Sequence, residues 1–153
     1  MIEEGFLDRV KPAAMFALHV WPPLRVGEAG YNAGAMWASS DRFKITITGK
    51  QSHGAQPHLG IDPIVIGAQI VTAFQSIVAR QVNIAEAPAV VTVGKFAGGN
   101  RSNIIPETVE LVGTIRAFDE GERTKIRDRV RAIATNYATA SGATAKVEFG
   151  LGY

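Results

Sequence analysis

Three histidines are the side chains of this chain best suited to proton transfer or metal binding: His19, His53 and His58. His53 and His58 follow an alternating apolar and polar run that stops at Gly49, and they precede a helix signal at Asp62. Loops between regular elements leave side chains accessible and often carry function. An imidazole in such a loop can donate or accept a proton near neutral pH, or bind a metal.

Two further polar side chains have alternative interpretations. Asn103 precedes Ile-Ile-Pro, so it is either a turn residue before a strand or a contact to a ligand. Arg116 lies on the outward side of a predicted strand, where a guanidinium is either solvated or binds a carboxylate with two parallel hydrogen bonds. His19 ends a short apolar run and is either a core histidine or a metal ligand. His53 is either a surface loop residue or part of a site.

The elements that must position these residues begin at residue 41. The pattern predicts strands at 41–48, 89–96, 107–118 and 143–149. Asp62 is placed as the N-cap of one helix, and Asp119 with Glu122 resembles a capping box at the start of another. We expect helix stripes in the core at Ile66, Ile70, Phe74 and Ile77, and at Ile126, Val130, Ile133 and Tyr137.

This βαββαβ order favours an α+β, ferredoxin-like fold. Since crossover connections are almost always right-handed, the four strands are expected to form one antiparallel sheet with both helices on one face. Before this predicted fold, residues 1–14 form a polar lead-in with helical tendency, and Met15–Val20 is predicted to be a short buried strand. Residues 27–36 are glycine-rich, with a weak strand expected before Trp37.

Composition excludes several classes of protein. At 153 residues, 46% of them hydrophobic, the chain is long enough for one domain with a core. A net charge of +2 is too small for a nucleic-acid-binding footprint. The absence of cysteine excludes disulfides and thiolate chemistry. The acidic N-terminal segment does not resemble a signal peptide, and no apolar run approaches about 18 residues. We therefore expect a cytoplasmic protein with no membrane partner.

The fold alone leaves three functions open. An RNA-binding sheet needs aromatic side chains on its exposed face, whereas the outward positions are predicted to be Lys44, Thr46 and Thr48 on the first strand and polar or aliphatic residues on the third. We therefore predict no nucleic-acid partner. A small-molecule-binding or oligomerisation module without catalysis stays open, as does part of a metal-dependent hydrolase.

Five ordered segments make the last alternative specific: Ala17–Pro22, Ser52–His58, Gly60–Pro63, Asn103–Pro106 and Gly113–Arg116. Together they resemble the metallo-aminoacylase and carboxypeptidase family, particularly its hippurate hydrolase, N-acyl-amino-acid amidohydrolase and auxin-conjugate hydrolase branch. The resemblance implies that residues 1–40 are a remnant of the metal-binding catalytic domain and that residues 41–153 are the dimerisation (lid) domain.

The resemblance also implies roles for the candidate residues. His19 would bind one of two divalent metal ions, zinc or manganese. His53 would reach into the active site of a partner subunit and donate a hydrogen bond to the oxyanion. Arg116 and Asn103 would hold the substrate carboxylate, and His58 is a weaker candidate for substrate contact. The substrate would be a small N-acyl or N-aroyl amino acid.

The family arrangement further implies a homodimer formed through edge strand 89–93 and helix 64–78. The other metal ligands and the general base of such enzymes are not found, because Glu3-Glu4 lacks the flanking pattern and no histidine follows His58. We therefore expect a fragment that by itself neither binds two metals tightly nor hydrolyses amides. A non-catalytic oligomerisation or small-molecule-binding module is the alternative.

Overall fold

The computed structural model describes residues 3–150 and 152. The chain divides into two units, Met1–Ala33 and Gly34–Tyr153, which are considered separately. The described residues of the first unit form one short helix, α1 (Phe6–Val10), within the predicted lead-in.

The predicted strand at Met15–Val20 is wrong. These residues have no regular structure, and the side chain of Leu18 is 98% exposed. A strand is stable only when a neighbour satisfies its backbone groups, and the described residues of the first unit contain no strand that would do so. The weak strand expected before Trp37 is also absent from the described residues.

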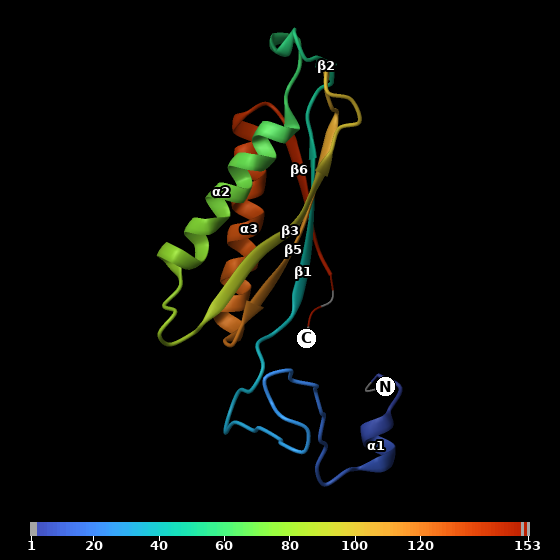
Figure 1. Cartoon of the computed structure of the whole chain (residues 1–153), viewed down its shortest axis with the longest axis vertical. Helices are drawn as coiled ribbons and strands as arrows, with labels where there is room; N and C mark the ends of the chain where they lie inside the picture. The colour runs from blue at the N-terminus through green and yellow to red at the C-terminus, as the bar shows by residue number, and fades with distance from the viewer. Residues whose placement is uncertain (1–2, 151, 153) are drawn as a thin grey trace. The chain divides into compact units, whose positions relative to one another are not determined.

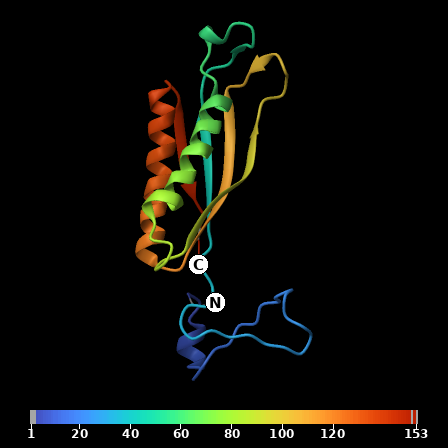
Figure 2. The same cartoon turned by 60° about the vertical axis from the view of Figure 1, so that its left-hand side comes forward.

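The second unit has the predicted ferredoxin-like architecture. Its sheet has the strand order β3-β5-β1-β6, with every neighbouring pair antiparallel. Both long helices cover the same face of the sheet (Figures 1 and 2). The elements are β1 (Asp41–Thr48), α2 (Pro63–Gln81), β3 (Ala89–Gly98), β5 (Thr108–Ala117), α3 (Glu120–Ala140) and β6 (Thr144–Phe149).

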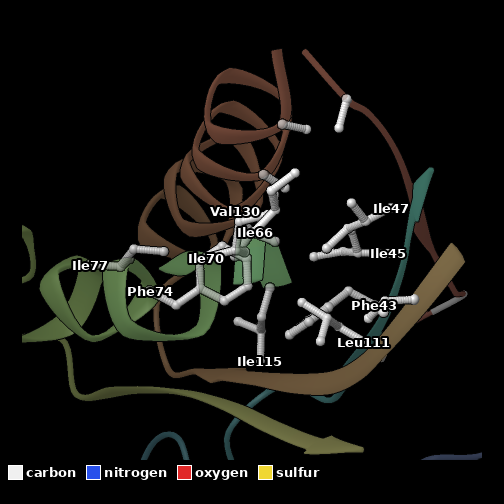
Figure 3. Packing of buried hydrophobic residues seen from close by; sticks show 14 of the residues in the cluster. Phe43, Ile45, Ile47, Ile66, Ile70, Phe74, Ile77, Leu111, Ile115 and Val130 are labelled. Carbon is white, nitrogen blue, oxygen red and sulfur yellow. The ribbon is translucent and has the colours of Figure 1, made fainter. Parts of the chain in front are cut away.

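The core lies between this sheet and the two helices (Figure 3). Phe43, Ile45 and Ile47 on β1 are fully buried, because alternate residues of a strand point to the same face. Gly113 on β5 lies directly opposite Phe43, and a side chain at that position would overlap the Phe43 ring. The ring of Phe43 also meets Phe74 of α2 edge-on, at 5.9 Å between centroids.

Both predicted helix caps are present. Asp62 Oδ1 accepts a hydrogen bond from the Ile64 N–H at 2.8 Å, and Asp119 Oδ1 accepts one from the Glu122 N–H at 2.8 Å. Each satisfies a backbone donor that has no partner within the helix.

The buried stripe of α3 differs from the prediction at its C-terminal end. It consists of Ile126, Val130, Ala134 and Ala138, at a constant spacing of four. Tyr137 lies one position away from this line and is 41% exposed, so its predicted place in the core is wrong. A spacing of four keeps residues on one face, whereas adjacent residues are about 100° apart around a helix.

By length and composition α2 would also pass as a membrane-spanning helix. Its inner face, however, packs in the core through Ile66, Ile70, Phe74 and Ile77. A core helix of a globular fold has the same apolar composition, so this feature does not by itself indicate a membrane.

Candidate functional site

His53 lies on a short arm that extends beyond one end of the sheet (Figure 1). The arm is a two-stranded ladder of β2 (Ser52–His53) and β4 (Ile104–Ile105), followed by the 3-10 turn η1 (Pro57–Leu59). His53 pairs with Ile104. The sequence pattern predicts only a loop here, because two-residue strands are too short to show alternation.

Hydrogen bonds fix both ends of the loop that carries His53. Lys50 and Ile61 exchange backbone bonds of 2.9 and 3.0 Å, and the Gly49 N–H donates to the Glu107 carbonyl at 2.8 Å. A side chain at position 49 would overlap the Ile61 carbonyl, so the close approach requires glycine. Residues 49–61 therefore form a closed loop tied to the sheet at its base.

Asn103 lies on the same arm as His53, immediately before Ile104, the residue that pairs with His53. The Gly54 N–H donates to the carbonyl oxygen of Asn103 at 2.7 Å, which continues the β2–β4 ladder by one bond. Both His53 and Asn103 are exposed. The His53 Nδ1 atom accepts a hydrogen bond from the Ala55 N–H at 3.1 Å. His58 lies on the neighbouring turn η1 and is also exposed.

Arg116 lies at the opposite end of the sheet. Thr108, at the end of β5 nearest the arm, and Arg116 are eight residues apart, which corresponds to about 27 Å along a strand. The Arg116 Nη1 donates to the hydroxyl of Ser40, immediately before β1, and to the Ile115 carbonyl at 3.5 Å. Within one chain, Arg116 is therefore not brought together with His53.

His19 lies in the first unit, where its Nδ1 is 2.7 Å from the Val20 carbonyl oxygen. A carbonyl only accepts, so the neutral ring carries its proton on Nδ1 and its lone pair on Nε2. This form is suited to metal ligation through Nε2. No group of three or more His, Cys, Asp or Glu residues suited to a metal is found in the described part of the chain. These residues alone therefore do not fit a two-metal centre.

The outward face of the sheet is charged but not aromatic. Glu110 on β5 pairs with Lys44 on β1 and Lys95 on β3, both at 2.6 Å. Hydrogen bonds from these two ammonium groups lower the pKa of Glu110 to about 2. The outward positions of β1, β5 and β6 carry no aromatic residue in the described structure, so a stacking platform for bases is missing there.

Comparison with known proteins identifies the lineage. The family model of the M20 peptidase dimerisation domain matches residues 38–141. The chain belongs to the M20 peptidase family. The matched region includes β1 to α3 together with the arm that carries His53.

Relatives in this family are hydrolases of C–N bonds. The chain is 40% identical over 149 residues to an N-acetyl-L-cysteine deacetylase of Bacillus subtilis, covering 97% of this chain and 35% of the relative. It is 41% identical over 153 residues to an N-acyl-L-amino acid amidohydrolase of Geobacillus stearothermophilus, covering 100% and 40%. A thermostable carboxypeptidase of Saccharolobus solfataricus is 38% identical, covering 97% and 37%. The chain thus spans well under half the length of these curated relatives.

A solved M20 structure has the same fold. It is a dinuclear metal binding peptidase from Bacillus subtilis, 32% identical, with a TM-score of 0.69 over 97% of this chain and 35% of that one. The family resemblance predicted from the five sequence segments is therefore confirmed.

Proposed function

We propose that this M20 chain is the dimerisation (lid) part of a metal-dependent amidohydrolase that cleaves the amide bond of N-acyl or N-aroyl amino acids. In this proposal residues 41–153 are the lid and residues 1–40 belong to the metal-binding domain. The observation that supports it is the arm beyond the sheet, which carries the exposed His53 and, immediately before its pairing partner Ile104, the exposed Asn103. The activities named for the relatives, deacetylation and N-acyl amino acid hydrolysis, supply the reaction class.

His53 is the proposed catalytic residue. When water adds to an amide carbon, negative charge develops on the carbonyl oxygen. An imidazole N–H held in place before the reaction stabilises that charge, and losing one such donor typically lowers kcat by about 10²–10³-fold. The closed loop of residues 49–61 supplies this kind of support, because its backbone is bonded at the base and along β2.

The proposed carboxylate contacts come from opposite ends of the lid. Asn103 lies on the same arm as His53, whereas Arg116 lies about 27 Å along β5 from Thr108, at the end of that strand nearest the arm. A twofold axis between antiparallel lids reverses the strand direction, so it turns the His53 end of one subunit towards the Arg116 end of the other. The proposed site therefore combines Arg116 of one subunit with His53 and Asn103 of its partner, and His58 is a further substrate contact near His53.

The proposed dimer uses α2 and the edge strand β3. Arg80 is the single ionisable residue of α2. The helix nevertheless has an exposed side, where Ile64 and Val65 are 40% and 52% exposed. In contrast, α3 carries eight ionisable residues between positions 120 and 131. An exposed helix side without charge favours contact with another protein surface.

The two edge strands of the sheet, β3 and β6, also differ in charge. Strand β6 has six residues and exposes the ion pair Lys146–Glu148, which protects an edge against association. Strand β3 has ten residues, and residues 89–94 are uncharged. Long uncharged edges pair readily with another strand, which supports the 89–93 edge and helix 64–78 as the interface.

In the parent enzyme two zinc or manganese ions would activate the attacking water. His19 would be one ligand, with Nε2 as the ligating atom. The other ligands are not found among the described residues, so we propose that the 153-residue chain alone does not hydrolyse amides. Turnover of an N-acyl amino acid by the purified chain with added zinc or manganese would contradict this part of the proposal.

A chimeric enzyme tests the role of His53. This chain would replace the matching 153 residues of the Geobacillus stearothermophilus amidohydrolase, to which it is 41% identical. We expect the chimera to hydrolyse N-acyl amino acids and His53→Ala to lower kcat by about 10²–10³-fold while the dimer stays intact. Lys146→Ala, on the protected edge, is the control and should leave kcat unchanged. A fully active His53→Ala dimer would leave only the alternative, a non-catalytic association module.

A further inference from the structure

The ring of His53 has a defined proton position because of one backbone group. The Ala55 N–H points at His53 Nδ1 over 3.1 Å. A backbone amide can only donate, so Nδ1 must hold a lone pair, and the proton of the neutral ring must be on Nε2. We propose that the Ala55 N–H is a positioning group that fixes His53 in the Nε2–H tautomer and aims that N–H away from its own loop.

The geometry of the turn explains why Ala55 is available for this task. Three consecutive amides after His53 each have a separate acceptor. The Gly54 N–H donates to the Asn103 carbonyl at 2.7 Å, and the Gln56 N–H donates to the His53 carbonyl at 2.8 Å. The Ala55 N–H lies between them and donates to the ring. The backbone bonds on both sides hold the central amide in the direction of the imidazole.

Position 54 maintains this arrangement. A Cβ at Gly54 would lie 3.1 Å from the Asn103 carbonyl oxygen, a tighter approach than ordinary van der Waals contact. The small residue therefore lets β4 come close enough to fix the turn.

His19 and His53 thus have opposite tautomers. In His19 the Nδ1 atom donates to the Val20 carbonyl, which leaves the lone pair on Nε2. In His53 the Nδ1 atom accepts, which leaves the hydrogen on Nε2. A ring that ligates a metal through Nε2 needs the first form, and a ring that donates to an oxyanion through Nε2 needs the second. The catalytic meaning of the His53 tautomer rests on the proposed function, whereas the tautomer itself does not.

Nitrogen NMR of the 153-residue chain labelled with 15N tests the proposal directly. The spectra are recorded at a pH of about 8.5, and the nitrogen signals report which ring nitrogen carries the hydrogen. We expect His53 to favour Nε2–H by roughly tenfold, the excess that one ordinary hydrogen bond supports. We also expect a scalar coupling across the hydrogen bond between the Ala55 amide nitrogen and His53 Nδ1. Exposed His58 in the same sample is the internal reference.

Two substitutions of Ala55 distinguish an effect of its backbone N–H from an effect of its side chain. Ala55→Pro removes the N–H and should shift the His53 tautomer ratio by about tenfold, towards that of His58. Ala55→Gly keeps the N–H and should retain the wild-type ratio. Unchanged amide signals from β1 and β5 would show that the sheet of Ala55→Pro is folded. The inference is overturned if wild-type His53 is Nδ1–H, if the coupling is absent, or if folded Ala55→Pro keeps the wild-type ratio.

The outcome is separable from that of the proposed function. In the chimeric amidohydrolase, Ala55→Pro should lower kcat more than it changes KM, and Ala55→Gly should restore kcat. If NMR shows the Nε2–H tautomer while His53→Ala leaves the chimera active, the catalytic proposal fails and the positioning inference stands. If His53→Ala abolishes activity while Ala55→Pro leaves the tautomer ratio unchanged, the positioning inference fails and the catalytic proposal stands.

Discussion

Asp41 and Arg123 form a two-pronged ion pair that joins the first residue of β1 to the first turn of α3. The Arg123 Nε is 2.6 Å from one carboxylate oxygen of Asp41, and Nη2 is 2.9 Å from the other. Asp41 is only 1% exposed. The guanidinium also binds Glu120 at 2.9 Å. The pair therefore fixes α3 relative to the strand at the centre of the fold.

Asp41→Asn should lower the free energy of unfolding by about 3 kcal/mol. It keeps the shape of the side chain but leaves the Arg123 guanidinium without its buried counter-charge, and breaking a buried pair is strongly destabilising. Asp128→Asn is the matched control, because its partner Arg131 is 50% exposed and such pairs contribute roughly 0–1 kcal/mol. Urea unfolding of both variants measures the difference. Equal stability of the two variants would contradict a structural role for the Asp41 pair.

The same pair predicts a pH dependence. The Arg123 hydrogen bond lowers the pKa of Asp41 below its ordinary value of 3.8. A depressed carboxyl pKa stabilises the folded state above the unfolded pKa, and this contribution is lost as the pH falls through the folded pKa. The stability gap between wild type and Asp41→Asn should therefore be full at pH 6 and shrink as the pH falls below about 4. A gap that widens on acidification would refute the sign of this effect.

Gly113→Ala should be severely destabilising, by about 3 kcal/mol, the upper end of the usual cost of overpacking a filled core. The added methyl group would overlap both the Phe43 ring and the Thr92 carbonyl. Gly94→Ala on the neighbouring strand is the control, since its Cβ would meet no atom within 4 Å. Thermal unfolding compares them, and a Gly113→Ala protein as stable as Gly94→Ala would contradict the packing described for Phe43.

Val65→Lys should weaken self-association while leaving the fold intact. Val65 is 52% exposed on α2, so the substitution places a charge in the proposed interface without disturbing the core. Asn136→Lys adds the same charge at an exposed position of α3 and serves as the control. In sedimentation at high micromolar concentration, we expect dimers of wild type and Asn136→Lys and monomers of Val65→Lys. A monomeric wild type would count against the dimer, and a dimeric Val65→Lys against this interface.

Much of the fold could be predicted from the sequence, because its strands alternate cleanly and its helices begin at strong caps. Asp62 and Asp119 both cap as expected, and Phe43, Ile45 and Ile47 are buried as alternation requires. The two failures have different causes. Met15–Val20 is apolar enough for a strand, but hydrophobic pattern does not reveal whether a pairing partner exists. Tyr137 is apolar enough for a core, but the exact direction of the helix stripe excludes it.

The sequence suggests the candidate residues one by one, but it does not predict how they are arranged in space. Sequence could not show that a two-residue ladder places Asn103 on the same arm as His53, because that pairing depends on the path of a loop fifty residues away. Nor could it show that Arg116 lies at the far end of the sheet and is held by Ser40. The Ala55 amide has no side-chain signature, so backbone positioning of the imidazole is visible only in three dimensions.

The near absence of ionisable groups from α2 has a kinetic consequence. Electrostatic attraction raises encounter rates above the 10⁵–10⁷ M⁻¹s⁻¹ typical of docking, and dissolved ions weaken that attraction within roughly 10 Å. Two surfaces that meet through residues 63–79 carry no such charges. Subunits that associate through these surfaces would therefore depend on diffusion and shape complementarity alone. Their association rate should change little between high and low ionic strength.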